Sequence, residues 1–212
     1  MHSGRLITFE GLDGCGKTTQ LEKAKDWLTE QGYDVLKTRQ PGGTKIGRKI
    51  RNILLDPEHE ELQPESELLL YLSDRIQHIQ ETIIPAKATG KIVLCDRFHD
   101  STVAYQGYGR GLNLNSIESV VAHCIKPYDP DLTILLNISP ETVPLRLEQR
   151  EEYAEKDRLD LESLNFFKKT AQGFQVLAAA ETERYVCLNG EQDIEVIHQE
   201  IVAVLQERFQ LG

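Results

Sequence analysis

The sequence predicts a three-layer α/β domain in which helices cover both faces of a doubly wound, five-stranded parallel sheet. Five short segments rich in Val, Ile and Leu lack regular polar alternation, and helical patterns separate them, as in a sheet that is buried on both faces. These segments are residues 5–9, 34–38, 91–95, 131–138 and 184–188. A glycine-rich turn follows the first segment, at the edge of the sheet where such folds bind ligands.

Length and composition fit one globular domain over residues 1–212. Hydrophobic residues make up 40% of the chain and charged residues 27%, which excludes a disordered or fibrous class. The net charge of −10 repels nucleic acid and anionic lipid, so neither is an expected partner. We find no apolar run of membrane-spanning length and no signal peptide, and we expect a cytoplasmic protein.

Helical patterns lie between the strands. Residues 17–31 form one that ends at Gly32, a common stop signal. Two apolar stripes at helical spacing predict faces that pack on the core. Their members are Leu69, Leu72, Ile76, Ile79 and Ile83, and then Ile194, Ile197, Ile201 and Val204.

Four cysteines are widely spaced, without a CxxC pair, which argues against zinc or a disulfide framework. We expect Cys95, Cys124 and Cys187 to be buried, reduced thiols, whereas Cys15 lies within the glycine-rich turn.

That turn fits the pattern GxxxxGK(S/T) at every fixed position, with a strand before it and a helix after it. Its residues are Gly11, Leu12, Asp13, Gly14, Cys15, Gly16, Lys17 and Thr18. Backbone N–H groups and the helix N-terminus can bind phosphate oxygens there. Lys17 supplies a charge for the β- and γ-phosphates of ATP, and Thr18 supplies a hydroxyl for Mg²⁺.

Charged residues also stand at the carboxyl ends of the second and third strands. Asp96, a candidate for Mg²⁺ or its water shell, precedes Arg97, whose guanidinium can bind phosphates. Arg39 precedes a Pro-Gly-Gly turn. We find no NKxD segment, which a GTPase would need to read its base.

Tyr71, Arg75 and His78 share the helix face opposite the Leu69 stripe. A ring that stacks on a base and a guanidinium that reads its edge would form a base site, although a plain surface Tyr and Arg is the alternative. We expect His78 to be a surface residue. The polar and aromatic run 100–111 follows Asp96 and Arg97, so it is expected to line the same cleft.

A charged segment over about residues 140–160 is predicted to close over ATP as a lid. Ser139 with Pro140 marks a helix start, and Pro144 makes its boundary uncertain. Arg150 and Arg158 lie within this segment.

Five ordered motifs closely resemble the bacterial thymidylate kinases, which are nucleoside monophosphate kinases of the P-loop type. They are FEGLDGCGKTTQ, TRQPGGT, YLSDR, DRFHDSTVAYQG with GRG, and DLTILLNISPE, and the likeness covers nearly the whole chain. The resemblance implies transfer of the ATP γ-phosphoryl group to dTMP, with Mg²⁺, by a homodimer.

The resemblance also implies roles for single residues. Asp13 matches a carboxylate of the family's phosphate loop that lies near the acceptor's sugar and phosphate. Arg97 matches an arginine that bridges the donor and acceptor phosphates. Arg39 resembles an acceptor-phosphate ligand. The resemblance further implies a catalytic arginine supplied by the lid, for which Arg150 and Arg158 are the two candidates, and the sequence does not choose between them. The implied base and sugar contacts are Tyr71, Arg75, Ser101, Tyr105 and Gln106.

The sequence differs from the family pattern at two positions and leaves two alternative functions open. Gln40 stands where bacterial members commonly have Glu, and Tyr71 where they usually have Phe. A kinase of the same fold for another nucleotide or a deoxynucleoside is one rival. The other is a catalytically silent nucleotide-binding module, against which the intact Lys17 and Arg97 argue.

Overall fold

The computed structural model describes residues 4–151 and 156–210 and contains the predicted parallel sheet, whose strand order is β2-β3-β1-β4-β5. The strands are β1 (Arg5–Glu10), β2 (Val35–Arg39), β3 (Ile92–Asp96), β4 (Leu132–Asn137) and β5 (Tyr185–Asn189). Each observed strand overlaps its predicted segment, and no end differs by more than one residue. The strand β1 pairs with β3 on one side and β4 on the other, so the glycine-rich turn leaves the middle of the sheet.

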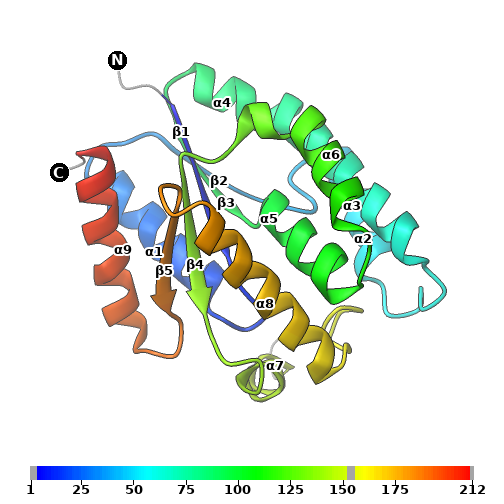
Figure 1. Ribbon diagram of the computed structural model, residues 1–212. Coiled ribbons are helices and arrows are strands. Elements are labelled where there is room, and N and C mark those ends of the chain that lie inside the picture. Colours follow the sequence, from blue (N-terminus) through cyan, green and yellow to red (C-terminus); the bar gives the residue numbers. More distant parts are fainter. Residues whose placement is uncertain (1–3, 152–155, 211–212) are drawn as a thin grey trace.

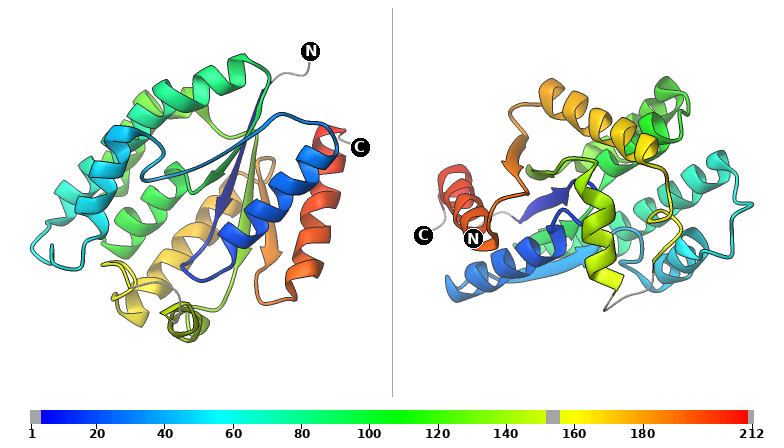
Figure 2. Two further views of the ribbon diagram at one scale, coloured as in Figure 1. Left: turned by 180° about the vertical axis from the view of Figure 1, so that it is seen from behind. Right: turned by 90° about the horizontal axis from the view of Figure 1, so that it is seen from below.

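Helices cover both faces of the sheet (Figures 1 and 2). On one face lie α1 (Lys17–Glu30) and α9 (Ile194–Phe209). The other face carries α3 (Pro64–His78), η1 (Ile79–Ile83), α4 (Ile84–Ala88), α5 (His99–Thr102), η2 (Val103–Gly109), α6 (Leu114–Cys124) and α8 (Leu164–Ala180). The remaining helices are α2 (Lys45–Leu55), η3 (Lys126–Tyr128) and α7 (Thr142–Glu151).

The core fills the space between these layers. Apolar side chains of β1, β3 and β4 are fully buried, as a parallel sheet covered on both faces requires. On one face they meet Leu21, Ala24 and Leu28 of α1 with Ile197 and Ile201 of α9. No helix in the described part of the chain is long and apolar enough to cross a membrane.

The apolar stripe on α3 was predicted incorrectly in part. Leu72, Ile79 and Ile83 are buried as expected, but Leu69 is 62% exposed and Ile76 is 37% exposed. The helix instead buries a polar face against the turn after β2 and the cavity, so two of its apolar residues point outward. In the second stripe Ile197 and Ile201 are buried, whereas Ile194 at the start of α9 is exposed.

Two of the cysteines also differ from expectation. Cys95 is buried in β3, but Cys187 is exposed and Cys124 only half-buried. Cys187 lies on β5, which is an edge strand of the sheet, and this explains its exposure. All four cysteines are free thiols.

Candidate active site

A cavity of about 380 Å³ opens at the carboxyl ends of β1, β2 and β3. It therefore lies where the order of the strands predicts a ligand site. Most of the residues that the sequence singled out line this cavity: Asp13, Gly14, Gly16, Lys17, Thr18, Arg39, Tyr71, Arg75, Asp96, Arg97, Ser101, Tyr105 and Gln106.

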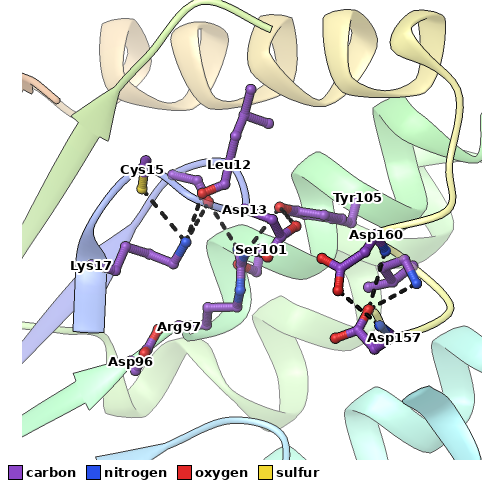
Figure 3. A network of polar contacts seen from close by, with 12 residues as sticks. Leu12, Asp13, Cys15, Lys17, Asp96, Arg97, Ser101, Tyr105, Asp157 and Asp160 are labelled. Carbon is purple, nitrogen blue, oxygen red and sulfur yellow. Dashed lines mark hydrogen bonds and ion pairs between the residues drawn. The ribbon is translucent and has the colours of Figure 1, made fainter. Parts of the chain in front are cut away.

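The phosphate loop joins β1 to α1 and carries Lys17 at the first position of that helix. The Lys17 ammonium donates to the carbonyl oxygens of Leu12 at 2.8 Å and Gly11 at 3.2 Å (Figure 3). It also lies 3.5 Å from the thiol of Cys15, which is itself buried. The loop thus holds its lysine beside the place where its own N–H groups converge.

Gly14 gives the loop its close contact with α7. Its φ of +76° lies in the left-handed region, and a Cβ there would come within 2.9 Å of the Arg146 side chain. Arg146 donates to the carbonyl oxygens of Gly14 at 3.2 Å and Gly190 at 3.0 Å. An arginine of α7 therefore reaches the phosphate loop.

Thr18 and Asp96 meet at the same end of the cavity. The Thr18 hydroxyl donates to a carboxylate oxygen of Asp96 at 2.8 Å, joining the start of α1 to the end of β3. A hydroxyl and a carboxylate side by side are the oxygen donors that Mg²⁺ prefers.

Arg97 lines the cavity and contacts side chains from the phosphate loop and from the helices after β3 (Figure 3). Its guanidinium donates to Asp13 at 2.6 Å, to the hydroxyl of Tyr105 at 2.9 Å and to that of Ser101 at 3.0 Å. The Tyr105 hydroxyl in turn donates to the second carboxylate oxygen of Asp13 at 2.7 Å. Arg97, Asp13 and Tyr105 therefore form a closed triangle of charge-assisted hydrogen bonds.

The triangle keeps Asp13 ionised. Burial alone would raise the pKa of Asp13, but Arg97, Lys17 and the Tyr105 hydroxyl outweigh it and lower the pKa to about 2. Burial raises the pKa of Tyr105 well above its ordinary value; the positive charge of Arg97 opposes this shift and the negative charge of Asp13 adds to it. At neutral pH the site presents a fixed carboxylate and a neutral phenol.

Behind the triangle, Glu10 at the end of β1 is fully buried. It accepts from the backbone N–H of Phe98 and from the Ser101 hydroxyl, both at 2.6 Å. Burial, and then the charge of Asp100, raise its pKa. Glu10 fixes the turn that presents Arg97 to the cavity.

Two further arginines and an aromatic ring also line the cavity. Arg39 ends β2, and Arg51 of α2 donates to the Pro41 carbonyl at 3.1 Å. Burial, and then the charge of Arg39, lower the pKa of Arg51, so an anion between the two guanidiniums would relieve their repulsion. Tyr71 is buried and lines the same cavity.

The face of α3 that carries Tyr71, Arg75 and His78 is buried rather than exposed. Arg75 is 1% exposed and His78 is 0% exposed, so the expectation that His78 is a surface residue was wrong. The Pro-Gly-Gly turn after β2 packs on this face, and helical periodicity carries no signal for such a contact. Arg75 lines the cavity and donates to the amide oxygen of Gln40 at 2.6 Å.

Gln106 and Arg158 both contact the buried carboxylate of Glu67. Gln106 donates to it at 2.8 Å, and the guanidinium of Arg158 pairs with its other oxygen. Arg158 also donates to the Leu54 carbonyl at 3.0 Å and is not among the residues that line the cavity. In this conformation Glu67 therefore engages one of the two arginines predicted for the lid.

The predicted lid begins with α7. The helix starts at Thr142, three residues after Ser139, which places Pro144 in its first turn, where a missing N–H is tolerated. Arg150 lies in α7, but its side chain and residues 152–155 are outside the part of the chain that the structure describes. Arg146, one turn earlier, is the α7 arginine that contacts the phosphate loop.

Comparisons with known proteins agree on one family. The family profile described as thymidylate kinase matches residues 9–201. The chain belongs to the thymidylate kinase family. A curated thymidylate kinase from Thermoanaerobacter sp. strain X514 is 43% identical to it over 96% of this chain and 98% of the relative's length. A curated thymidylate kinase from Carboxydothermus hydrogenoformans is 44% identical over 96% of this chain and 97% of its own length. A crystal structure of thymidylate kinase from Ehrlichia chaffeensis is 33% identical, with a TM-score of 0.79, over 97% of this chain and all of that one.

The thymidylate kinase match begins at Phe9 and so includes every predicted residue of the cavity wall. Sequence reasoning missed Glu10, Arg51 and Arg146. An acidic residue that ends a buried strand was an available signal for Glu10. Arg51 and Arg146 lie on helices as ordinary charged residues, and only the packing of α2 and α7 brings them to the site.

Proposed function

We propose that the chain phosphorylates dTMP with ATP to give dTDP and ADP, and that the cavity at the carboxyl edge of the sheet is the active site. Membership of the thymidylate kinase family supports the activity. The observation that carries the assignment of the site is that one cavity is lined by the phosphate loop, by Arg97, and by Arg39 and Arg51 together with the buried Tyr71.

The donor end binds the triphosphate of ATP. Loop N–H groups and the N-terminus of α1 hold the phosphates, and Lys17 exchanges the Gly11 and Leu12 carbonyls for phosphate oxygens. Arg146 is placed beside the same loop, and we add it to Arg150 and Arg158 as a third candidate for the arginine that stabilises charge on the transferred group.

Thr18 and Asp96 would hold Mg²⁺, since their oxygens already lie 2.8 Å apart at the phosphate end of the cavity. When bound there, the ion neutralises charge on the phosphates of ATP.

The acceptor end binds dTMP. Arg39 and Arg51 take its phosphate, Tyr71 stacks on its base, and Arg75 meets the edge of the base. Tyr105, fixed between Phe166 and Phe174 with ring centroids 5.9 and 6.1 Å away, packs beneath the sugar. The attacking atom is a phosphate oxygen that is already ionised, so the reaction needs no general base. An Asp13 with a pKa of about 2 therefore acts by holding Arg97 in line.

Three statements about the whole chain belong to the same proposal. The chain acts as one domain whose lid, over about residues 140–160, closes on ATP. It works in the cytoplasm. It forms a homodimer through the outer face of α3, where Leu69 and Ile76 lie exposed seven residues apart.

The test is ADP release from Mg-ATP with dTMP, dUMP, CMP, UMP, GMP, AMP and thymidine offered one at a time. We expect dTMP to give the highest kcat/KM. Lys17→Ala should fold but lose at least about 100-fold in kcat, because it removes the cation that meets the transferred phosphates. Turnover with a different acceptor alone would refute the assignment of the base site, and near-normal turnover of Lys17→Ala would refute the assignment of the donor site.

A further inference from the structure

Three side chains behind Arg75 form a buried hydrogen-bonded chain that the phosphate chemistry does not use. The amide oxygen of Gln40 accepts from Arg75 Nε at 2.6 Å, and the amide nitrogen of Gln40 lies 2.7 Å from His78 Nδ1. His78 Nε2 lies 2.7 Å from the hydroxyl of Thr38. Gln40 and His78 are both buried, so these contacts are shielded from water.

The direction of each hydrogen bond follows from Arg75. A guanidinium only donates, so Gln40 must turn its oxygen toward Arg75 and its NH₂ group toward His78. His78 Nδ1 then accepts, and Nε2 carries the proton and donates to Thr38. This arrangement requires a neutral imidazole. Burial, and then the charge of Arg75, lower the pKa of His78 to about 4, which keeps the ring neutral across the physiological range.

The same residues tie α3 to the turn after β2. A Cβ on Gly43 would lie 2.4 Å from the His78 ring, so the ring packs directly on the turn backbone. Asp74, four residues before His78, accepts from the Gly42 N–H at 3.0 Å. Arg39 directly precedes this turn. The contacts between the turn and α3 therefore fix Arg39, at the phosphate end of the proposed acceptor site, relative to Arg75.

Arg75 itself has few other anchors. It donates to the Thr102 hydroxyl, and its guanidinium lies over the Phe98 ring with 5.8 Å to the centroid. Among the hydrogen bonds and ion pairs of the described residues, none joins Arg75 to a carboxylate. Gln40 is thus a neutral support, which orients the guanidinium without pairing its charge and leaves that charge for the acceptor.

We propose that Gln40 and His78 are positioning residues for acceptor recognition, which fix the Arg75 guanidinium at the cavity wall and so set the affinity for dTMP rather than the rate of phosphoryl transfer. The proposal rests on the proposed function, in which Arg75 meets the base of dTMP. Gln40 itself lines the cavity, whereas His78 does not and can act on the acceptor only through Gln40 and Arg75.

Two His78 variants separate positioning from simple packing. In His78→Asn the amide oxygen takes about the place of Nδ1 and still accepts from Gln40. In His78→Gln the longer amide takes about the place of Nε2, keeps the contact with Thr38 and loses the acceptor for Gln40. Gln40→Met removes both amide contacts with little change in volume. Loss of about one neutral hydrogen bond corresponds to a roughly five- to tenfold change.

We therefore expect His78→Gln and Gln40→Met to raise the KM for dTMP about tenfold and His78→Asn about twofold. In all three variants the KM for ATP and kcat should change by less than about twofold. His198→Gln and Gln206→Met on α9, on the other face of the sheet, are the matched controls. Thermal unfolding of each variant shows that the protein measured is folded.

The outcomes separate this proposal from the proposed function. An unchanged KM for dTMP in both Gln40→Met and His78→Gln would overturn the positioning role, as would equal losses in His78→Asn and His78→Gln. If Arg75→Met leaves the KM for dTMP unchanged, the base contact of the proposed function is wrong, and the positioning role fails with it. A raised KM in Arg75→Met with unchanged values in the other variants refutes the positioning role alone.

Discussion

Arg97 has a backbone φ of 68°, in the left-handed region that residues other than glycine rarely adopt. The backbone is held there because the Arg97 N–H donates to the Phe9 carbonyl at 3.0 Å and the next N–H, of Phe98, donates to Glu10. The unusual conformation turns the guanidinium toward Asp13 and the phosphate loop. Strain of this kind persists where neighbouring contacts over-determine it, as at functional sites.

Arg97→Lys tests this geometry at the scale of one residue. A lysine keeps the positive charge but loses the planar fork, whose two separate nitrogens donate to Ser101 on one side and to Asp13 and Tyr105 on the other. We expect kcat to fall about 100-fold or more, because a preorganised donor is lost from the transition state. Steady-state kinetics with dTMP and ATP measures it. Tyr105→Phe, which removes one contact of the triangle, should cost less, and a larger loss in Tyr105→Phe than in Arg97→Lys would contradict this assignment.

The pH dependence of stability tests the neutral state of His78. The pKa of His78 is about 4 in the folded protein and 6.5 in an ordinary environment, so the unfolded chain binds more protons between these values. The free energy of unfolding contributed by this residue is unaffected above about pH 6.5 and falls by about 3 kcal/mol as the pH drops to about 4.

His78→Gln should therefore lose less unfolding free energy than the wild type between pH 6.5 and 4, measured by urea unfolding. Asp157 acts in the opposite direction, because burial, and then Asp160, raise its pKa to about 6. This contribution is present in both proteins and cancels in the comparison. Parallel pH profiles for the two proteins would show that His78 is protonated at its ordinary pKa.

At the scale of the element, α3 shows what periodicity can and cannot predict. The spacing of its apolar residues predicted the helix correctly, but that spacing does not show which of these residues pack on the core and which stay exposed. Leu69 and Ile76 therefore could not be told apart from Leu72 in advance. The burial of His78 and Arg75 depends on the turn after β2, which contacts α3 from more than thirty residues away in sequence.

The carboxylate of Glu67 joins α3 to two other segments. It is fully buried and pairs with Arg110 at 3.1 Å and with Arg158, while Arg110 also pairs with Glu162. Burial opposes its ionisation, but Arg110, Gln106 and Arg158 lower the pKa of Glu67 below its ordinary value. Glu67 thus joins α3 to Arg158, in the segment before α8, and to Arg110.

Glu67→Gln should lower the free energy of unfolding by about 3 kcal/mol, because it leaves buried guanidinium charge without its partner. Glu162→Gln is the matched control: that carboxylate is partly exposed and should cost less than about 1 kcal/mol. Urea unfolding at pH 7 measures both. Equal losses of unfolding free energy in the two variants would show that burial does not increase the contribution of the Glu67 ion pairs to stability.

Across the whole molecule, the net charge of −10 coexists with a cavity wall that holds Lys17, Arg39, Arg51, Arg75 and Arg97. The sequence could predict the sheet and the donor side, because a buried strand followed by the phosphate loop is a local pattern. Helix spacing and the family resemblance also indicated Arg39, Tyr71 and Arg75 on the acceptor side, whereas the contact of Arg146 with the phosphate loop depends on packing of α7 that arises only on folding. Composition reports the average charge and gives no sign of this local reversal.

The proposed homodimer is tested on the outer face of α3. Leu69 and Leu145 are each 62% exposed, but Leu69 lies on α3 and Leu145 on α7. A carboxylate at position 69 would have to be desolvated between two copies of the chain, which opposes association. We expect Leu69→Glu to be a folded monomer by light scattering, whereas the wild type and Leu145→Glu have twice the mass of the chain. A dimeric Leu69→Glu would place the interface on another face, and a monomeric wild type would refute the homodimer.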